Sequence, residues 1–515
     1  MLTPSLEQVK QLAKQYNTIP VFYDFSADNQ TPINLYRAMS EGAKNAFIFE
    51  SVNNGEQWGR YSFVGANPKQ EIQMHGTTAC ILENNQKKTF MVEHPILFLK
   101  ERMAQYSAPV LPDAPNFTGG LIGYFGYDTV RYMEKTLVNV PEDDIHMPDC
   151  DLFLYEELVA YDHLKHNGIV IQNLHTDGNL DAQYAAALWR AEELAQKIRT
   201  YNPTPKPTLK TGTAIVHSNT SKDAYMDIVR QAKEHIVNGD IFQIVLSQRF
   251  EIQNPPDSFD VYRKLRVSNP SPYLYYFHTP TYDVAGASPE MLASVKNGTI
   301  HNRPIAGTKP RGKTREEDMQ NETDLLADPK ERAEHTMLVD LGRNDVGKVS
   351  EFGSVSVTRY MVTERASKVM HLVSDVEGTL RKDLTALDAL MAILPAGTLS
   401  GAPKVRAMEL IDQFEPKKRG LYGGTVGYLG FNGNMDTCIA IRTVLFTNQK
   451  AYVQAGAGIV ADSVPENEYY ETVNKALAVI NAIKEAAQLF CFWIIMILSL
   501  TTCISISGNC IRIFR

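Results

Sequence analysis

Apolar residues in this chain repeat with two different periods, and this mixture limits the folds that the chain can adopt. Alternation with a period of two, as in the run from Ala46 to Ser51, predicts short strands between turns. A helical period follows Ser221 and ends at Gly239, and alternation returns from Ile241 to Phe250. One face of that last strand should carry Phe242, Ile244 and Leu246, and the other face Gln243, Ser247 and Arg249. Strands and helices follow each other without a regular βαβ rhythm, which favours an α+β fold over a Rossmann-type sheet.

A proline-rich run, from Tyr201 to Pro207, divides the chain into two parts. Proline disfavours helix at its own position and at the residue before it, so this run is expected to be an extended linker. The sequence therefore predicts an N-terminal region over 1–200 and a second domain over 215–487. Residues 488–515 form a third and atypical segment.

Composition limits the classes of partner and compartment. Of the 515 residues, 44% are hydrophobic and 21% are charged, and the formal net charge is -8. These values describe an ordinary globular protein and argue against nucleic-acid binding, which needs a basic face. The six cysteines have neither CxxC pairs nor zinc spacing, and Met1 to Lys14 lacks a signal-peptide pattern. Reduced thiols and a cytoplasmic location are expected.

The C-terminal segment departs from this picture. No charged residue occurs between Ala486 and Ile511, and Leu489 to Leu498 is an unbroken apolar run, which meets the length criterion for a membrane span. Its second half, however, mixes in small and polar residues. An atypical apolar extension, for instance from a shifted reading frame, is the preferred interpretation, and a tail anchor is the alternative.

The run from Arg303 to Gly312 combines two glycines and two prolines with three cations. Gly307 allows close backbone approach and Thr308 offers a hydroxyl, so the run is able to hold an acidic ligand. A basic loop rich in glycine and proline is, taken alone, more often a solvated turn.

Ala455 to Ala461 matches the pattern GxGxxA after a predicted strand, so a dinucleotide site has to be considered. Asp462 to Pro465 interrupts the chain where the phosphate-binding helix should already run. A glycine turn that presents amide groups to a carboxylate fits better.

Two acidic groups are candidates for metal binding. Glu468, Glu471 and Lys475 share one face of the helix predicted after Ser463, and Glu334 lies in a second predicted helix. Each group alone has the pattern of a solvated surface. Carboxylates without histidine or cysteine suit Mg²⁺, which keeps several waters and bridges to an anionic ligand.

These segments together resemble a known family. The motifs occur in its order and, with the Arg303 loop, cover about Ser221 to Ala487: Ala287-Ser288-Pro289-Glu290, Ala333-Glu334-His335, Asp340 to Asp345, Gly397 to Lys404, Gln454 to Gly458 and Glu471 to Lys475. They resemble the chorismate-utilising enzymes and, among them, anthranilate synthase component I. The resemblance implies that family's α+β fold, in which β-sheets pack as a sandwich with flanking helices.

The resemblance also implies a chemistry and roles for residues. Chorismate and ammonia would give anthranilate and pyruvate, the first step of tryptophan biosynthesis, with Mg²⁺ held by Glu334 and Glu471 and supported by Glu468. Glu290 would be the general acid that protonates the departing C4 hydroxyl, in surroundings that raise its pKa. The substrate would be bound by Gly307, Thr308, Tyr428, Arg442, Gly456, Ala457, Gly458 and Lys475.

Two positions separate the branches of this family. Relatives that make aminodeoxychorismate typically carry a nucleophilic lysine where this chain has Ala306. Relatives that add water to chorismate typically carry a lysine where this chain has Gln243, which is able to position ammonia but not to activate water. Aminodeoxychorismate synthase component I and a non-catalytic regulatory relative remain the alternatives.

The resemblance further implies two other molecules. The cysteines lack the context of a glutaminase nucleophile, so a glutamine amidotransferase subunit is the expected ammonia donor. L-Tryptophan is the expected feedback inhibitor. Its site would combine Ser51 with Pro272, Tyr273 and Leu274, although Leu274 replaces the methionine that is typical there.

Overall fold

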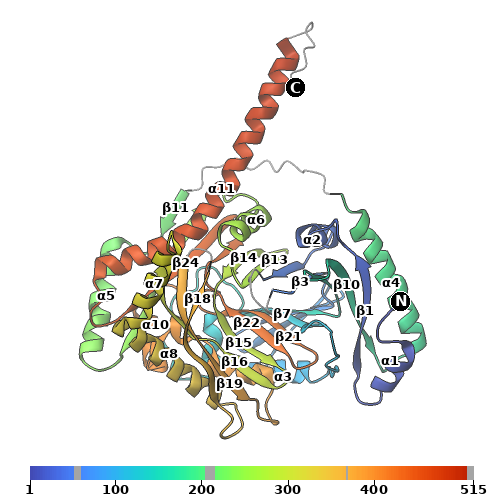
Figure 1. The fold of residues 1–515 in the computed structure, drawn as a ribbon, viewed down its shortest axis with the longest axis horizontal. Coiled ribbons are helices and arrows are strands. Elements are labelled where there is room, and N and C mark those ends of the chain that lie inside the picture. Colours follow the sequence, from blue (N-terminus) through green and yellow to red (C-terminus); the bar gives the residue numbers. More distant parts are fainter. Residues whose placement is uncertain (52–58, 203–214, 367–368, 507–515) are drawn as a thin grey trace.

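The computed structural model of the chain describes the backbone of residues 1–51, 59–202, 215–366 and 369–506, and side chains up to residue 487. Two large antiparallel sheets lie at its centre with helices around them, so the structure has the predicted α+β class (Figure 1).

The first sheet, here sheet A, includes the strand that leads into Glu290. Its order is β1 (Thr18–Ser26), β10 (Asn167–His175), β9 (Glu157–Asp162), β3 (Tyr61–Ala66), β2 (Ala46–Glu50), β13 (Tyr273–His278), β14 (Tyr282–Ser288), β23 (Thr443–Thr447), β24 (Lys450–Ile459), β12 (Gln243–Gln253) and β11 (Ile215–Ser218). The short β20 (Gly401–Ala402) pairs with the start of β12.

The second sheet, sheet B, begins with the strand of the Arg303 loop. Its order is β17 (Ile305–Pro310), β19 (Val369–Thr379), β16 (Thr299–Asn302), β15 (Met291–Lys296), β22 (Met435–Ile439), β21 (Thr425–Gly430), β7 (Gly120–Phe125), β8 (Cys150–Tyr155), β4 (Gln70–His75), β5 (Thr78–Glu83) and β6 (Gln86–Met91). β18 (Ser356–Arg365) pairs with β19.

Both sheets combine strands from before and after the proline-rich run. In sheet A the two groups meet where β2 pairs with β13, and in sheet B they meet where β7 pairs with β21. The predicted parts 1–200 and 215–487 are therefore continuous through hydrogen-bonded sheets. Most of the predicted linker, residues 203–207, lies outside the described residues.

Helices cover the outer faces of both sheets. α2 (Pro32–Ser40), α4 (Leu180–Thr200), α6 (Ser258–Ser268) and α11 (Pro465–Ile506) pack on sheet A, while α8 (Pro329–Gly347) and α9 (Ala386–Ile393) pack on sheet B. The other helices are α1 (Leu6–Leu12), α3 (Pro95–Met103), α5 (Lys222–Val237), α7 (Arg315–Ala327), α10 (Lys404–Phe414) and the 3₁₀ turns Tyr127–Tyr132 and Gly397–Leu399.

An aromatic layer fills the space between the sheets. Phe47 of sheet A meets Tyr155 of sheet B with ring centroids 4.8 Å apart. Two hydrogen bonds also cross this layer: the Tyr282 hydroxyl donates to Asp151 over 2.9 Å, and the Tyr273 hydroxyl donates to Asp436 over 2.9 Å. Burial raises the pKa of both carboxyl groups, that of Asp436 to about 7. These hydrogen bonds satisfy groups that would be costly to bury alone.

Local predictions from the sequence were mostly confirmed. α5 begins after Ser221, whose side chain accepts from the Ala224 amide, and Gly239 follows with a φ of +83°. The predicted strand is β12, but Phe242 lies before it and is 73% exposed. The residues predicted for its polar face, Gln243, Ser247 and Arg249, are buried. β12 is second from one edge of sheet A, but α5, α10 and α11 pack on it, and Glu415 and Asp144 contact Ser247 and Arg249, so both of its faces are covered.

The last helix, α11, extends away from the body of the molecule to Ile506 (Figure 1). Among the residues whose side chains are described, no helix combines the length and the apolar character needed to cross a bilayer. The side chains of 488–515 are not described, so the apolar extension and its tail-anchor alternative stay predictions.

The Tyr282–Asp151 hydrogen bond allows a test of the sandwich. We expect Tyr282→Phe to destabilise the protein by about 1–3 kcal/mol, because a buried carboxyl group loses a donor. The midpoint of thermal unfolding measures this loss. Tyr23→Phe, on the half-buried end of β1, is the matched control, and equal midpoints for both variants would contradict the assigned role.

Candidate functional site

Glu290 lies in the turn between β14 and β15, where sheet A passes into sheet B. Its backbone carbonyl accepts from the Ile439 amide over 3.0 Å, and its carboxylate accepts from the Thr398 hydroxyl over 3.0 Å. Burial raises the pKa of Glu290 to about 7, while Thr398, Lys475 and Arg442 oppose that shift. The effect of burial on the pKa is larger than the combined effect of these three neighbours. A large share of the Glu290 carboxyl groups is therefore protonated near neutral pH.

Arg442 and Lys475 bring positive charge to the side of Glu290. Arg442 has a φ of +50° at the start of β23, and Lys475 projects from α11. The Lys475 ammonium donates to the Gly456 carbonyl over 3.2 Å and pairs with Glu471 over 2.7 Å. The side chains of Arg442 and Lys475 are exposed, so the side of Glu290 on which they lie is open to solvent.

Residues 455–458 lie within β24 and not in the turn that the sequence predicted. β23 pairs with β24 only as far as Val453, whereas β12 continues beside it to Ile459. Beyond Val453 one edge of β24 therefore has no partner strand among the described residues. Backbone amides on such an edge are available to an anionic ligand.

Close contacts explain why glycine is needed in this stretch. A Cβ atom on Gly456 would lie 2.7 Å from the Tyr422 hydroxyl, and one on Gly458 would lie 2.8 Å from the Gln243 side-chain amide. Both distances are shorter than ordinary van der Waals contact. The structure thus brings Gln243 and Tyr422 to the predicted glycine segment.

Tyr428 lies elsewhere. Its ring packs on Phe117 in the layer between the sheets, with centroids 4.5 Å apart, and is only 8% exposed. The tyrosine at the glycine segment is Tyr422. Tyr428 was implied by the family resemblance, and the pairing of β21 with β7, which has no local sequence signal, decides which way its side chain points.

The loop from Arg303 to Gly312 contains β17 and an irregularity between Ala306 and Lys309. Gly307 has a φ of +66°, and its carbonyl oxygen lies 2.9 Å from Nδ1 of His371. The Thr308 hydroxyl lies 3.1 Å from the same nitrogen.

Two of the three cations expected to hold an acidic ligand are already paired. Arg303 contacts Glu364 and Asp375, and Arg311 pairs with Asp318 over 2.7 Å. These ion pairs hold the loop against neighbouring side chains. From the sequence, the cations had been expected to hold an acidic ligand instead.

Among the acidic candidates, Glu334 is half-buried on α8, and Glu468 and Glu471 lie on α11. Burial raises the pKa of Glu468, and the charge of Glu471 raises it further, while Lys330 of α8 lowers it. The ends of these two helices are thus close enough to interact electrostatically. In the described part of the chain, no three histidine, cysteine or acidic side chains gather as a complete metal site.

Thr398 and His371 are functional candidates that the sequence interpretation did not select. Burial and the charge of Arg442 lower the pKa of His371, so His371, Arg442 and Glu290 share one region. The position of His371 between apolar Met370 and Leu372 was the available signal, while Thr398 gave none beyond its motif.

The residues predicted for tryptophan binding lie together. Glu50 at the end of β2 pairs with Leu274 of β13, which places Ser51 beside the segment Pro272–Leu274. The Ser51 hydroxyl is buried and has no hydrogen-bond partner among the described residues. Residues 52–58, next to it, lie outside the described chain.

Comparison with known proteins agrees with this geometry. The family model for chorismate binding enzymes matches residues 44–481. Anthranilate synthase component 1 of Acetivibrio thermocellus is 49% identical over 95% of this chain and 100% of its own length. The Pseudomonas aeruginosa protein of that name is 46% identical, covering 94% of this chain and 99% of its own.

Solved structures show the same fold. Anthranilate synthase component I from Streptococcus pneumoniae superimposes with a TM-score of 0.72 at 42% identity, covering 83% of this chain and 94% of that one. The menaquinone-specific isochorismate synthase of Escherichia coli, at 18% identity and a TM-score of 0.67, covers 93% of this chain and 99% of its own and shares the fold.

These matches span nearly the whole chain and include the segments that carry Glu290, Arg442 and Lys475. The chain therefore belongs to the chorismate-binding enzyme family, as an anthranilate synthase component I, a lyase that converts chorismate in tryptophan biosynthesis.

Proposed function

We propose that this chain adds ammonia to C2 of chorismate, expels the C4 hydroxyl as water, and then eliminates pyruvate to leave anthranilate. Chorismate and ammonia thus give anthranilate, pyruvate and one water. The burial of the Glu290 carboxyl group is the observation that supports this proposal most strongly, because it raises the pKa to about 7, a value that suits a general acid.

Glu290 donates its proton to the C4 oxygen as the carbon–oxygen bond breaks. The Thr398 hydroxyl donates to one carboxyl oxygen, Oε1. The other oxygen is then left to carry the proton toward the substrate. General acid catalysis of this kind is worth roughly 10²- to 10⁴-fold in rate.

Substrate carboxylates are held by Arg442, Lys475 and the free edge of β24. Backbone amides of the segment Gly456–Gly458 donate hydrogen bonds to one carboxylate on the edge that β23 leaves open. Tyr422, rather than Tyr428, borders this position, and the Gly307–Thr308 loop fixed by His371 completes it. Gln243 lies beside Gly458 and positions ammonia, and Ala306 offers no nucleophile for a covalent route.

The acidic residues fit a shared site for Mg²⁺. Glu334 and Glu471 would hold the ion and Glu468 a bound water, a set of hard oxygen donors that leaves room for a substrate carboxylate. The pKa of Glu468 is raised in part by the charge of Glu471. This fits a site in which the negative charges of neighbouring carboxylates are not fully balanced by cations. When bound, Mg²⁺ would neutralise the ring carboxylate and act as a Lewis acid.

A glutamine amidotransferase subunit is the proposed ammonia donor, because the relatives are named component 1. The buried cysteines Cys80, Cys150 and Cys438 are free thiols, which supports the cytoplasm as the compartment.

L-Tryptophan is the proposed inhibitor. It would bind where β2 meets β13, between Ser51 and the segment Pro272–Leu274, and the unpartnered Ser51 hydroxyl supports a polar ligand there. Binding at this junction would bias how the two halves of sheet A are arranged.

The pH dependence of the reaction tests the role of Glu290. Because its pKa is about 7 and only the protonated form donates, kcat/KM for chorismate should fall as pH rises through that value. Thr398 lowers this pKa, so Thr398→Val should move the fall to higher pH. Fluorescence of anthranilate, recorded at constant free ammonia, measures both profiles.

Glu290→Gln is the matched variant for the same experiment. It keeps the shape of the side chain but removes the acid, so kcat should drop by roughly 10²- to 10⁴-fold. An unchanged rate, or the same descending limb in this variant, would rule out Glu290 as the general acid.

Replacing Glu334 by Gln should raise the Mg²⁺ concentration needed for half-maximal activity by about tenfold or more, because one charged oxygen donor is lost. Titration of activity with MgCl₂ measures this change, and Glu331→Gln, three residues earlier on α8, is the control. A metal requirement equal to that of the unaltered chain would remove Glu334 from the site.

A bulky residue at Ser51 should abolish inhibition by tryptophan while leaving the uninhibited rate within about twofold. Ser51→Leu, assayed with increasing L-tryptophan, is the test, and Ser40→Leu at the end of α2 is the control. Unchanged inhibition of the Ser51 variant would place the effector site elsewhere.

A further inference from the structure

A buried ion pair lies directly behind the turn that carries Thr398. Glu415 follows the last residue of α10, and Pro416 prevents that helix from continuing. Four residues after Glu415 the chain brings in Arg419, whose guanidinium donates to both carboxylate oxygens, over 2.8 Å and 2.6 Å. Arg419 is 2% exposed and Glu415 is 4% exposed, so protein encloses the pair.

The remaining donors of Arg419 hold the Thr398 turn. Nη1 donates to the carbonyl of Leu399, the residue after Thr398, over 2.6 Å, and Nη2 donates to the Val245 carbonyl of β12 over 2.7 Å. The Val245 amide in turn donates to the Ser400 carbonyl over 3.0 Å. The backbone on the C-terminal side of Thr398 is therefore fixed both to Arg419 and to β12.

The same ion pair also contacts residues beside the glycine segment of β24. Glu415 accepts from the Ser247 amide over 2.7 Å and from the Ser247 hydroxyl over 2.9 Å. The Gln454 side-chain amide donates to that hydroxyl over 2.8 Å. The central carbon of the Arg419 guanidinium lies 5.6 Å from the ring centroid of Tyr422. The pair thus connects the turn with the strand that borders the substrate position.

Stability alone does not explain this enclosed pair of charges. Taking two charges out of water is costly, and apolar side chains of similar volume often stabilise a fold equally well. Glu415 also neutralises Arg419, so the pair adds little positive charge for a substrate carboxylate. Apolar side chains are not able to supply the donor that fixes the Leu399 carbonyl, one residue from the hydroxyl that contacts Glu290.

We propose that Arg419 is a positioning residue for the reaction: through the Leu399 carbonyl it holds the Thr398 hydroxyl against the Glu290 carboxyl group. A loosened turn would weaken the hydrogen bond from Thr398. Because that bond lowers the pKa of Glu290, its loss would raise the pKa. This inference rests on the proposed function, in which Glu290 is the general acid.

Arg419→Lys tests the positioning role. Lysine keeps the positive charge beside Glu415, but its single nitrogen is not able to reach Glu415, Val245 and Leu399 together as the planar guanidinium does. With ammonium chloride at constant free ammonia, the fall of kcat/KM for chorismate should move to higher pH by about 0.5, the direction expected of Thr398→Val. In a chain with both substitutions the shift should not exceed that of Thr398→Val alone, because both act on one hydrogen bond.

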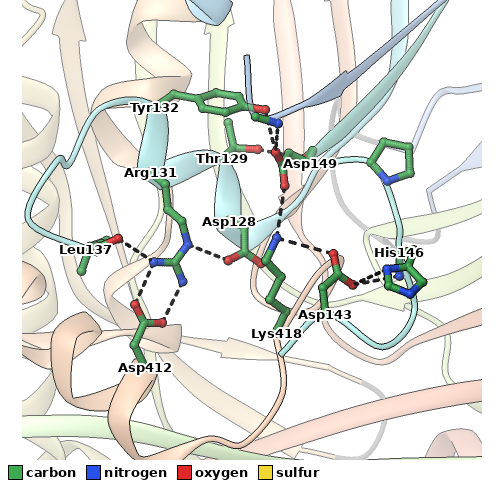
Figure 2. A network of polar contacts seen from close by, with 12 residues as sticks. Asp128, Thr129, Arg131, Tyr132, Leu137, Asp143, His146, Asp149, Asp412 and Lys418 are labelled. Carbon is green, nitrogen blue, oxygen red and sulfur yellow. Dashed lines mark hydrogen bonds and ion pairs between the residues drawn. The ribbon is translucent and has the colours of Figure 1, made fainter. Parts of the chain in front are cut away.

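Arg131→Lys is the matched control. The Arg131 guanidinium donates to both carboxylate oxygens of Asp412 over 2.8 Å and to the Leu137 carbonyl over 3.0 Å, as Figure 2 shows. This set of partners resembles that of Arg419, so the two variants should lower the midpoint of thermal unfolding to a similar extent. Among the described residues Arg131 makes no hydrogen bond to the Thr398 turn, so its variant should keep the pH profile of the unaltered chain.

If Arg419→Lys does not fold, Arg419→Met combined with Glu415→Gln removes both charges and keeps an acceptor at residue 415. The same shift is expected of that variant. An unmoved profile in the Arg419 variants, a shift that adds in full to that of Thr398→Val, or an equal shift with Arg131→Lys would overturn the positioning role. A flat profile in the unaltered chain would instead refute Glu290 as the general acid, and with it the proposed function.

Discussion

Two strand pairings join the halves of the molecule, and the rest of the structure depends on them. β2 with β13 in sheet A, and β7 with β21 in sheet B, connect strands that are far apart in the sequence. The aromatic layer between the sheets forms only if both pairings hold, because each sheet supplies one wall. The turn that carries Glu290 runs from one sheet to the other, so its position follows from this packing.

At the site, the balance between burial and charge decides the chemistry. Arg442, Lys475 and Thr398 all favour the ionised form of Glu290, yet enclosure by protein raises its pKa to about 7. A site with fewer enclosing residues would leave the carboxyl group ionised and unable to protonate a leaving hydroxyl. In the proposed function the same cations hold the substrate carboxylates, so the protein would combine an acid with an anion site by burying the acid more deeply than the cations.

Local sequence signals predicted the elements better than their partners. Ser221 and Gly239 define α5 because capping depends on neighbouring residues. The resemblance implied both Glu290 and Arg442 for the site, and in the structure Arg442 is close enough to lower the pKa of Glu290. The pairing of β2 with β13 has no local signal, and neither do the ion pairs that engage Arg303 and Arg311. Tyr422 lies in the turn before β21 and Tyr428 lies within β21, where long-range strand pairing decides which way its side chain points.

The most direct test is anthranilate formation by the chain alone, followed by fluorescence with chorismate, ammonium chloride and MgCl₂, with and without a chelator. The account predicts anthranilate and pyruvate in equal amounts, formed only when Mg²⁺ is free to bind. Chorismate that stays intact, or that becomes isochorismate or aminodeoxychorismate, would contradict the assignment of Glu290, Gln243 and the acidic residues to this reaction.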